Sequence, residues 1–213
     1  MPMAFSYDEV LYPGDARSQT HPDRLATIAV LHGMEAAPPD ACRLLEIGCG
    51  DGSNLIPMAF WLPQSRFAGV DLAVRPIDEA RENASALGLH NIELHRADLR
   101  EIDASFGQFD YIIAHGLYSW VPAEVRDRLL EVTARSLAPA GVAYISYNTY
   151  PGAPLKMMLR EMMLHHARSA GGPAEQLERS RHLARFLAAN LDESAGLPLA
   201  LKRESERLLE RLP

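Results

Sequence analysis

Short apolar runs alternate with amphipathic stretches between residues 43 and 148, and this alternation predicts the fold. Five runs have the length and apolar content of buried strands. They lie at 43–47, 66–71, 91–96, 109–114 and 142–147. Between them apolar residues recur at helical spacing, for example at Ile77, Ala80, Ala84 and Leu87. This order predicts an α/β fold with a doubly wound, mostly parallel sheet, in which ligands bind at the carboxyl ends of the strands.

The pattern changes after residue 150, where three helical stretches follow without a strand. They lie at 155–168, 174–191 and 199–212. We therefore expect an N-terminal cap segment over 1–40, the sheet domain over 41–150 and a helical C-terminal segment over 151–213. The chain stops just after an amphipathic run, which favours a truncation before further domains. The helical segment then packs on that missing region or on a second copy, as a homodimer.

Composition narrows the class of protein. The chain has 213 residues, is 47% hydrophobic and carries a net charge of −7, which argues against a dedicated nucleic-acid or membrane partner. No apolar run approaches the roughly 18 residues of a membrane span, and the first ten residues do not resemble a signal peptide. The two cysteines, Cys42 and Cys49, lack the spacing of a zinc site, so we expect no metal. A cytoplasmic location is the default expectation.

Three glycines, Gly48, Gly50 and Gly52, stand between the first strand and the first helix of the sheet domain. Glycine accepts positive φ and lets a ligand approach the backbone closely. Pro57 is compatible with a helix only near its start, so we expect this helix to begin at about residues 52–54. Its unpaired amides would then favour a polar or anionic group at the loop.

The spacing of these glycines disfavours a dinucleotide. A dinucleotide fingerprint needs a glycine at position 53, where this chain has Ser53. Glu46, just before the loop, would repel a pyrophosphate and suits a cationic ligand. An NAD-dependent oxidoreductase is therefore the weaker hypothesis.

The pattern E-x-G-x-G-x-G from Glu46 resembles motif I of the class I S-adenosylmethionine-dependent methyltransferases. Four further segments resemble later motifs of that class, at 67–72, 97–99, 109–114 and 136–142. The resemblance implies a Rossmann-like sheet, S-adenosyl-L-methionine as cofactor and S-adenosyl-L-homocysteine as product. It also implies that Asp71 binds the ribose hydroxyls and Asp98 the adenine amino group, although each aspartate also suits a helix cap. The expected cofactor contacts are completed by Glu46, Gly48, Cys49, Gly50, Leu72 and Leu99.

The flanking segments narrow the resemblance. Residues 7–10, 20–26, 114–122 and 146–152 resemble bacterial proteins that join this catalytic domain to a methyltransferase regulatory domain, and rickettsial-type protein lysine methyltransferases are similar to that group. A protein lysine is thus the sharpest guess for the methyl acceptor, with a small molecule next. The main alternative is a catalytically silent module or fragment that only binds the cofactor.

Two sets of residues are candidates for the rest of the site. His115 and Tyr118 follow the fourth strand, where acceptor and cofactor should meet, and we expect catalytic roles for both and a cofactor contact for His115. Tyr7, Tyr12 and His21 precede the sheet and are expected to cover the cofactor. Structural roles, as packing aromatics or a loosely packed leader, are equally compatible with these sequences.

Overall fold

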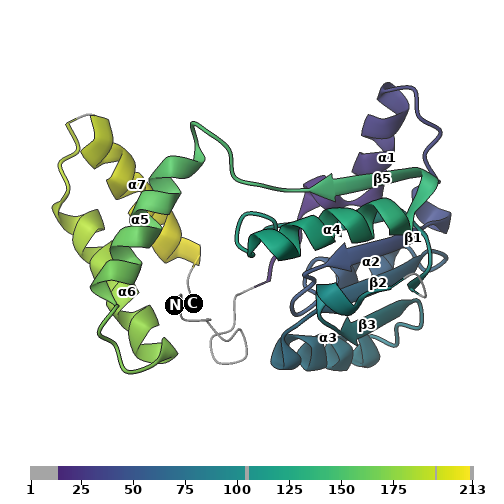
Figure 1. The fold of residues 1–213 in the computed structure, drawn as a ribbon, viewed down its shortest axis with the longest axis horizontal. Coiled ribbons are helices and arrows are strands. Elements are labelled where there is room, and N and C mark those ends of the chain that lie inside the picture. The colour runs from purple at the N-terminus through teal and green to yellow at the C-terminus, as the bar shows by residue number, and fades with distance from the viewer. Residues whose placement is uncertain (1–13, 104–105, 195, 212–213) are drawn as a thin grey trace. The chain divides into compact units, whose positions relative to one another are not determined.

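The computed structural model describes residues 14–103, 106–194 and 196–211, which fall into two units. One unit runs from Gly14 to Tyr147, and the described part of the other begins at Asn148. The first holds the sheet, and the second holds three helices (Figure 1).

The sheet has five strands, and its topology places the candidate site. They are β1 Arg43–Ile47, β2 Arg66–Asp71, β3 Ile92–Arg96, β4 Phe109–Ala114 and β5 Leu137–Ile145. The spatial order is β3-β2-β1-β4-β5 and every neighbouring pair is parallel, which confirms the expected doubly wound fold. The order reverses between β1 and β4. Ligands of such sheets bind beside the carboxyl ends of the strands at this reversal.

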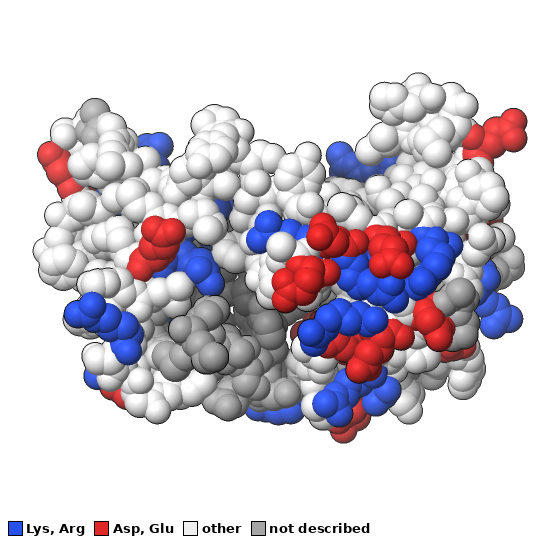
Figure 2. Space-filling view, viewed as in Figure 1, with Lys and Arg blue, Asp and Glu red and all other residues white. Residues whose placement is uncertain are grey.

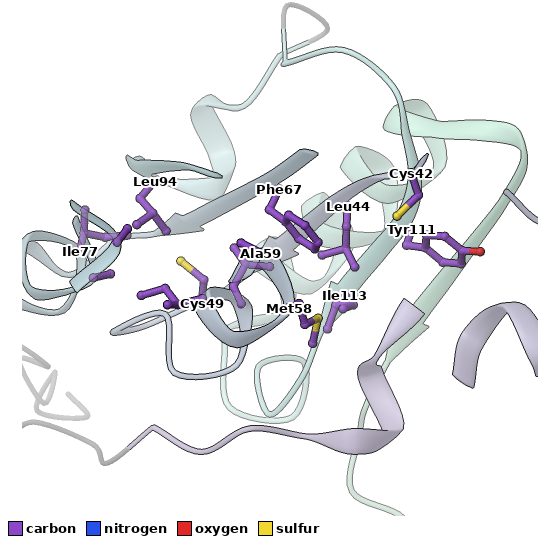
Figure 3. Packing of buried hydrophobic residues seen from close by; sticks show 14 of the residues in the cluster. Cys42, Leu44, Cys49, Met58, Ala59, Phe67, Ile77, Leu94, Tyr111 and Ile113 are labelled. Atoms are coloured by element: carbon purple, nitrogen blue, oxygen red, sulfur yellow. The ribbon is translucent and has the colours of Figure 1, made fainter. Parts of the chain in front are cut away.

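Helices cover both faces of the sheet and bury a core on each. The elements are η1 Ser18–Thr20, α1 Pro22–Leu31, η2 Pro39–Ala41, α2 Leu55–Trp61, α3 Val74–Ala86, η3 Leu99–Glu101 and α4 Ala123–Ser136. Helices α1, α2 and α3 contribute to one apolar cluster, in which Leu44, Phe67 and Tyr111 of the strands gather around Met58 and Ala59 of α2 (Figure 3). Helix α4 and η3 contribute to the second cluster on the opposite face. Because both faces are covered, β1, β2 and β4 are almost wholly buried.

Two details differ from the sequence-based prediction. Strand β5 begins at Leu137, directly after α4, and not at residue 142. Pro139 lies inside it, at a break in the register between Phe109 and Tyr111 of β4, and such edge positions tolerate a residue that lacks an N–H group. Leu87 was expected on the buried face of its helix, but α3 ends at Ala86 and Leu87 is 51% exposed.

The second unit consists of α5 Ala153–His166, α6 Pro173–Asn190 and α7 Gly196–Arg211, close to the expected helices. Leu159, Ala184, Leu187 and Leu201 are buried in it. No helix within the described residues is long and apolar enough to cross a membrane.

Candidate cofactor site

The glycine loop follows β1 at the point where the strand order reverses. Gly48, Gly50 and Gly52 all have positive φ, at +77°, +53° and +74°, so the backbone path needs glycine at each position. The Gly48 and Cys49 N–H groups donate to the Val70 carbonyl at 2.8 and 3.2 Å. This pairing fixes the loop to the end of β2.

Backbone N–H groups of the loop are already hydrogen-bonded within the protein, whereas the sequence led us to expect unpaired amides there. The Gly50 N–H group donates to the Asp71 carboxylate at 2.9 Å, and the Gly52 N–H group donates to the Cys49 carbonyl at 3.0 Å. The Ser53 N–H group donates to the Asp51 side chain at 3.0 Å. Phosphate-binding loops hold their anion with unpaired amides, so this pairing disfavours a pyrophosphate. Beside Gly50 an added Cβ would meet nothing within 4 Å, which leaves open space for a ligand at the loop.

Glu46 is the penultimate residue of β1, just before this loop, and is only 4% exposed. Its Oε1 accepts a hydrogen bond from the Asn54 amide at 2.7 Å, whereas its buried Oε2 has no partner among the described residues. Burial raises the pKa of Glu46 to about 7; the Asn54 hydrogen bond opposes this rise, and the negative charges of Asp51 and Asp71 add to it. An unpartnered carboxylate oxygen at a ligand loop suits a ligand that carries a positive charge or a donor.

Asn54 is a site residue that the sequence reasoning missed, and it connects Glu46 with residues 14–20, here called the N-terminal strap. Its Oδ1 accepts from the Arg17 N–H group at 2.8 Å, and its Nδ2 donates to the Thr20 hydroxyl oxygen at 3.1 Å. The strap also contacts the loop at Gly14, where an added Cβ would lie 2.6 Å from the Cβ of Ser53. An asparagine before an apolar helix indicates a cap, so only the fold reveals these partners.

Asp71 ends β2 and lies against the loop, as expected for a ligand-binding carboxylate. One oxygen accepts from Gly50 N–H and the other from Ala73 N–H, both at 2.9 Å. Each carboxylate oxygen retains a lone pair for a further donor such as a hydroxyl. Leu72, the next residue, is 62% exposed and offers apolar surface beside it.

Asp98 adopts the role of helix cap that the sequence left open. Its carboxylate accepts from the Arg100 backbone N–H group at 2.9 Å and forms an ion pair with the Arg100 guanidinium at 2.5 Å. The hydrogen bond from the Arg100 side chain is the main cause that lowers the pKa of Asp98. The Leu99 side chain is buried in the second core cluster, away from solvent. Adenine contacts by Asp98 and Leu99 therefore stay predictions.

His115 and Tyr118 lie in the segment after β4, and each contacts another aromatic ring. The His115 ring stacks on Tyr144 of β5 with ring centroids 6.2 Å apart. Burial, and secondly the charge of Arg17, lower the pKa of His115, so its imidazole is neutral at pH 7. Tyr118 contacts the Tyr147 ring edge-on at 6.2 Å. It also borders a hollow of about 320 Å³, lined by Tyr118, Leu130, Ile145 and Tyr147.

Of the three N-terminal candidates, only His21 lies within the described residues. Tyr7 and Tyr12 lie outside the described residues. His21 caps α1, because its Nδ1 accepts the Asp23 N–H group at 3.3 Å. A cofactor contact by any of the three stays a prediction.

The visible surface over α4 carries acidic and basic side chains side by side (Figure 2). Arg128 and Glu131 of α4 pair at 2.7 Å, and Arg135 lies 3.8 Å from the same carboxylate. On this face, positive charge is thus neutralised within the helix and does not form a basic surface.

Comparisons with known proteins agree with this geometry. Residues 44–141 match the family model described as a methyltransferase domain. The Rickettsia prowazekii protein RP789 is 46% identical over 88% of this chain and 34% of its own length, and RP028 of the same organism is 39% identical over 96% of this chain and 82% of its own length. The structure of PKMT2 from Rickettsia typhi in complex with AdoHcy is 37% identical, with a TM-score of 0.79 over 92% of this chain and 38% of that one.

The fold and the glycine loop thus define a Rossmann-like nucleoside-binding domain. The chain belongs to the class I S-adenosylmethionine-dependent methyltransferases. The sequence-based assignment of S-adenosylmethionine as the cofactor is confirmed, and the unpartnered Glu46 oxygen and the open space at Gly50 fit such a cationic nucleoside. The chain spans about a third of the length of RP789 and of PKMT2.

Proposed function

We propose that this chain carries the cofactor site and active site of an enzyme that methylates lysine side chains of proteins. The observation that carries the proposal is the 37% identity with Rickettsia typhi PKMT2 over 92% of this chain. The flanking motifs of the sequence agree with it, since they resemble bacterial methyltransferases with a regulatory domain, to which rickettsial-type protein lysine methyltransferases are similar.

In this proposal, the residues at the carboxyl ends of the strands each bind a different part of the cofactor. Glu46 faces its ammonium group, the loop at Gly50 provides close approach, and Asp71 holds the ribose hydroxyls. Asp98 receives the adenine amino group in exchange for part of its pairing with Arg100. When bound, S-adenosylmethionine supplies an electrophilic methyl group on a positively charged sulfur.

The chain's own task is then to align the acceptor and to remove its proton. A lysine ammonium must lose a proton before its nitrogen lone pair is available, and in this proposal the His115 imidazole, whose pKa is lowered by burial, accepts that proton. The ring faces of Tyr118 and Tyr147 attract a nearby cation, and the hollow they border offers apolar surface to the lysine stem. Alignment of this kind supplies much of the rate of an in-line displacement.

Methyl transfer from S-adenosylmethionine with a tritiated methyl group tests the proposal. The acceptor is a bacterial protein extract, used untreated or with its lysines blocked by exhaustive acetylation. We expect label in the untreated protein fraction, located on lysine by mass spectrometry, and little label in the blocked extract. Label confined to small molecules, or equal label in both extracts, contradicts the lysine assignment.

Two histidine variants test the proposed base. His115→Ala should lower the transfer rate with little change in cofactor affinity, whereas His90→Ala, an exposed histidine before β3, should leave both unchanged. An equal rate in the two variants removes His115 from the proton transfer.

A further inference from the structure

We propose that Asn54 is a positioning residue: it joins the N-terminal strap to the Glu46 carboxyl and keeps this carboxyl ionised for the ammonium group of the cofactor. The proposal rests on the role assigned above to Glu46. Its evidence is the arrangement of Asn54 itself, a residue that no motif of the family assignment requires.

One amide group serves both partners, and its contacts with Glu46 and Thr20 are buried. Nδ2 of Asn54 donates to Glu46 Oε1 at 2.7 Å and to Thr20 Oγ1 at 3.1 Å, and Oδ1 accepts from the part-buried Arg17 N–H group at 2.8 Å. Asn54 is 8% exposed, Glu46 4% and Thr20 0%. Water cannot easily replace Asn54 as the partner of Glu46 or Thr20, so loss of either buried contact leaves a polar group unpaired.

The chemistry of an amide is what this position needs. An amide offers two donors and an acceptor, whereas an aspartate offers only acceptors when ionised and an alanine offers neither. The Glu46 carboxylate needs a donor, and the strap needs an acceptor for the Arg17 N–H group. Asparagine at 54 meets both needs at once.

The charges around Glu46 explain why the Asn54 hydrogen bond affects the protonation of this carboxyl. Burial and the carboxylates of Asp51 and Asp71 favour the protonated form, while the Asn54 hydrogen bond favours the ionised form. The Cys49 thiol in the loop also interacts with the Glu46 charge, and Arg17 of the strap is bonded to Asn54 through its backbone N–H group. With the pKa of Glu46 at about 7, loss of one donor moves the carboxyl toward its protonated form at neutral pH.

Strap and cofactor are thereby coupled. A strap held by Asn54 keeps Nδ2 aimed at Glu46, and a displaced strap releases Asn54 from two of its three partners. The affinity for the cofactor then depends on the hydrogen bonds between the strap and Asn54, although the cofactor contacts neither of these partners in this proposal.

The test is calorimetric titration of the chain with S-adenosylhomocysteine between pH 6 and pH 8.5. For the wild type, affinity should rise about tenfold between pH 6 and pH 8, because Glu46 ionises over this range. Asn54→Ala should move the midpoint of this rise upward by about one pH unit and lower the affinity at pH 7 about fivefold. Thr20→Val should shift the midpoint in the same direction by a smaller amount.

Asn91→Ala is the matched control, because the Asn91 amide also donates part-buried hydrogen bonds, to the Ala59, Leu62 and Ser65 carbonyls. It should lower the melting temperature and leave the pH midpoint in place. An unmoved midpoint in both Asn54→Ala and Thr20→Val overturns the proposal, because a merely structural asparagine weakens binding equally at every pH. If Asn54→Ala does not fold, Thr20→Val decides alone. A wild type that binds no S-adenosylhomocysteine refutes the cofactor site itself, which is a different failure.

Discussion

Replacing Glu46 by glutamine should stabilise the folded chain at neutral and alkaline pH and weaken cofactor binding. Glutamine keeps the oxygen that accepts from Asn54 and places an uncharged amide where Oε2 has no partner. It therefore imitates the protonated carboxyl and removes only the buried negative charge.

The magnitude follows from the pKa of Glu46, which rises from an ordinary value of 4.5 to about 7 in the folded chain. Each pKa unit corresponds to about 1.4 kcal/mol, so ionised Glu46 destabilises the fold by about 3 kcal/mol relative to its protonated form. The folded state binds this proton more tightly than the unfolded chain does. The wild type therefore loses stability as the pH rises from about 4.5 to about 7, and the glutamine variant does not lose this part.

Urea unfolding without cofactor, at pH 4.5, 6 and 8, measures the effect. The advantage of Glu46→Gln should grow from below about 1 kcal/mol at the lowest pH to about 3 kcal/mol at the highest. Glu79→Gln, which changes an exposed glutamate of α3, serves as the control. A stability difference that is equal at the three pH values, or a glutamine variant less stable at pH 8, refutes the reasoning. Calorimetry with S-adenosylhomocysteine at pH 8 should show weaker binding to the same stabilised variant.

Three further substitutions address the loop and the core. Asp71→Asn should weaken S-adenosylhomocysteine binding by about 1–3 kcal/mol in calorimetry, because an amide is uncharged and has one accepting oxygen, whereas the carboxylate has two, which already accept from Gly50 and Ala73 and can each accept from a ribose hydroxyl; Asp78→Asn on the surface of α3 should not. Gly52→Ala should destabilise the chain by about 1–3 kcal/mol in urea, since φ is +74° and the new Cβ would lie 3.2 Å from the Cβ of Ala80; unchanged stability would show that the loop can relax. Leu129→Ala should lower the unfolding free energy by about 2–5 kcal/mol, because the side chain is 0% exposed between α4 and the sheet; a loss below about 1 kcal/mol would contradict its place in the core.

The fold was predictable because burial of both faces of the sheet requires apolar residues at regular positions, and this pattern is visible in the sequence. The strand runs are short and apolar, and Ile77, Ala80 and Ala84 are buried at the helical spacing that the sequence shows. The predicted start of β5 was wrong because Pro139 lies inside this strand. A proline is tolerated there because β5 lies at the edge of the sheet and its register with β4 is broken at this point, and only the pairing with β4 shows this.

The site was predictable where a residue's position along its strand decides its role. Glu46 and Asp71 lie near the carboxyl ends of neighbouring parallel strands, so their meeting at the loop follows from topology. The pairing of the loop amides and the partnership of Asn54 with Arg17 and Thr20 could not be predicted. Both depend on contacts between segments that are distant in sequence, and no spacing rule encodes them.

The central claim is that this loop binds a cationic nucleoside and not a pyrophosphate. Calorimetric titration of the chain with S-adenosylhomocysteine and, separately, with NAD tests it most directly. We expect one binding site for S-adenosylhomocysteine, weakened in Asp71→Asn, and no measurable heat with NAD. A clear titration with NAD and none with S-adenosylhomocysteine would contradict the account.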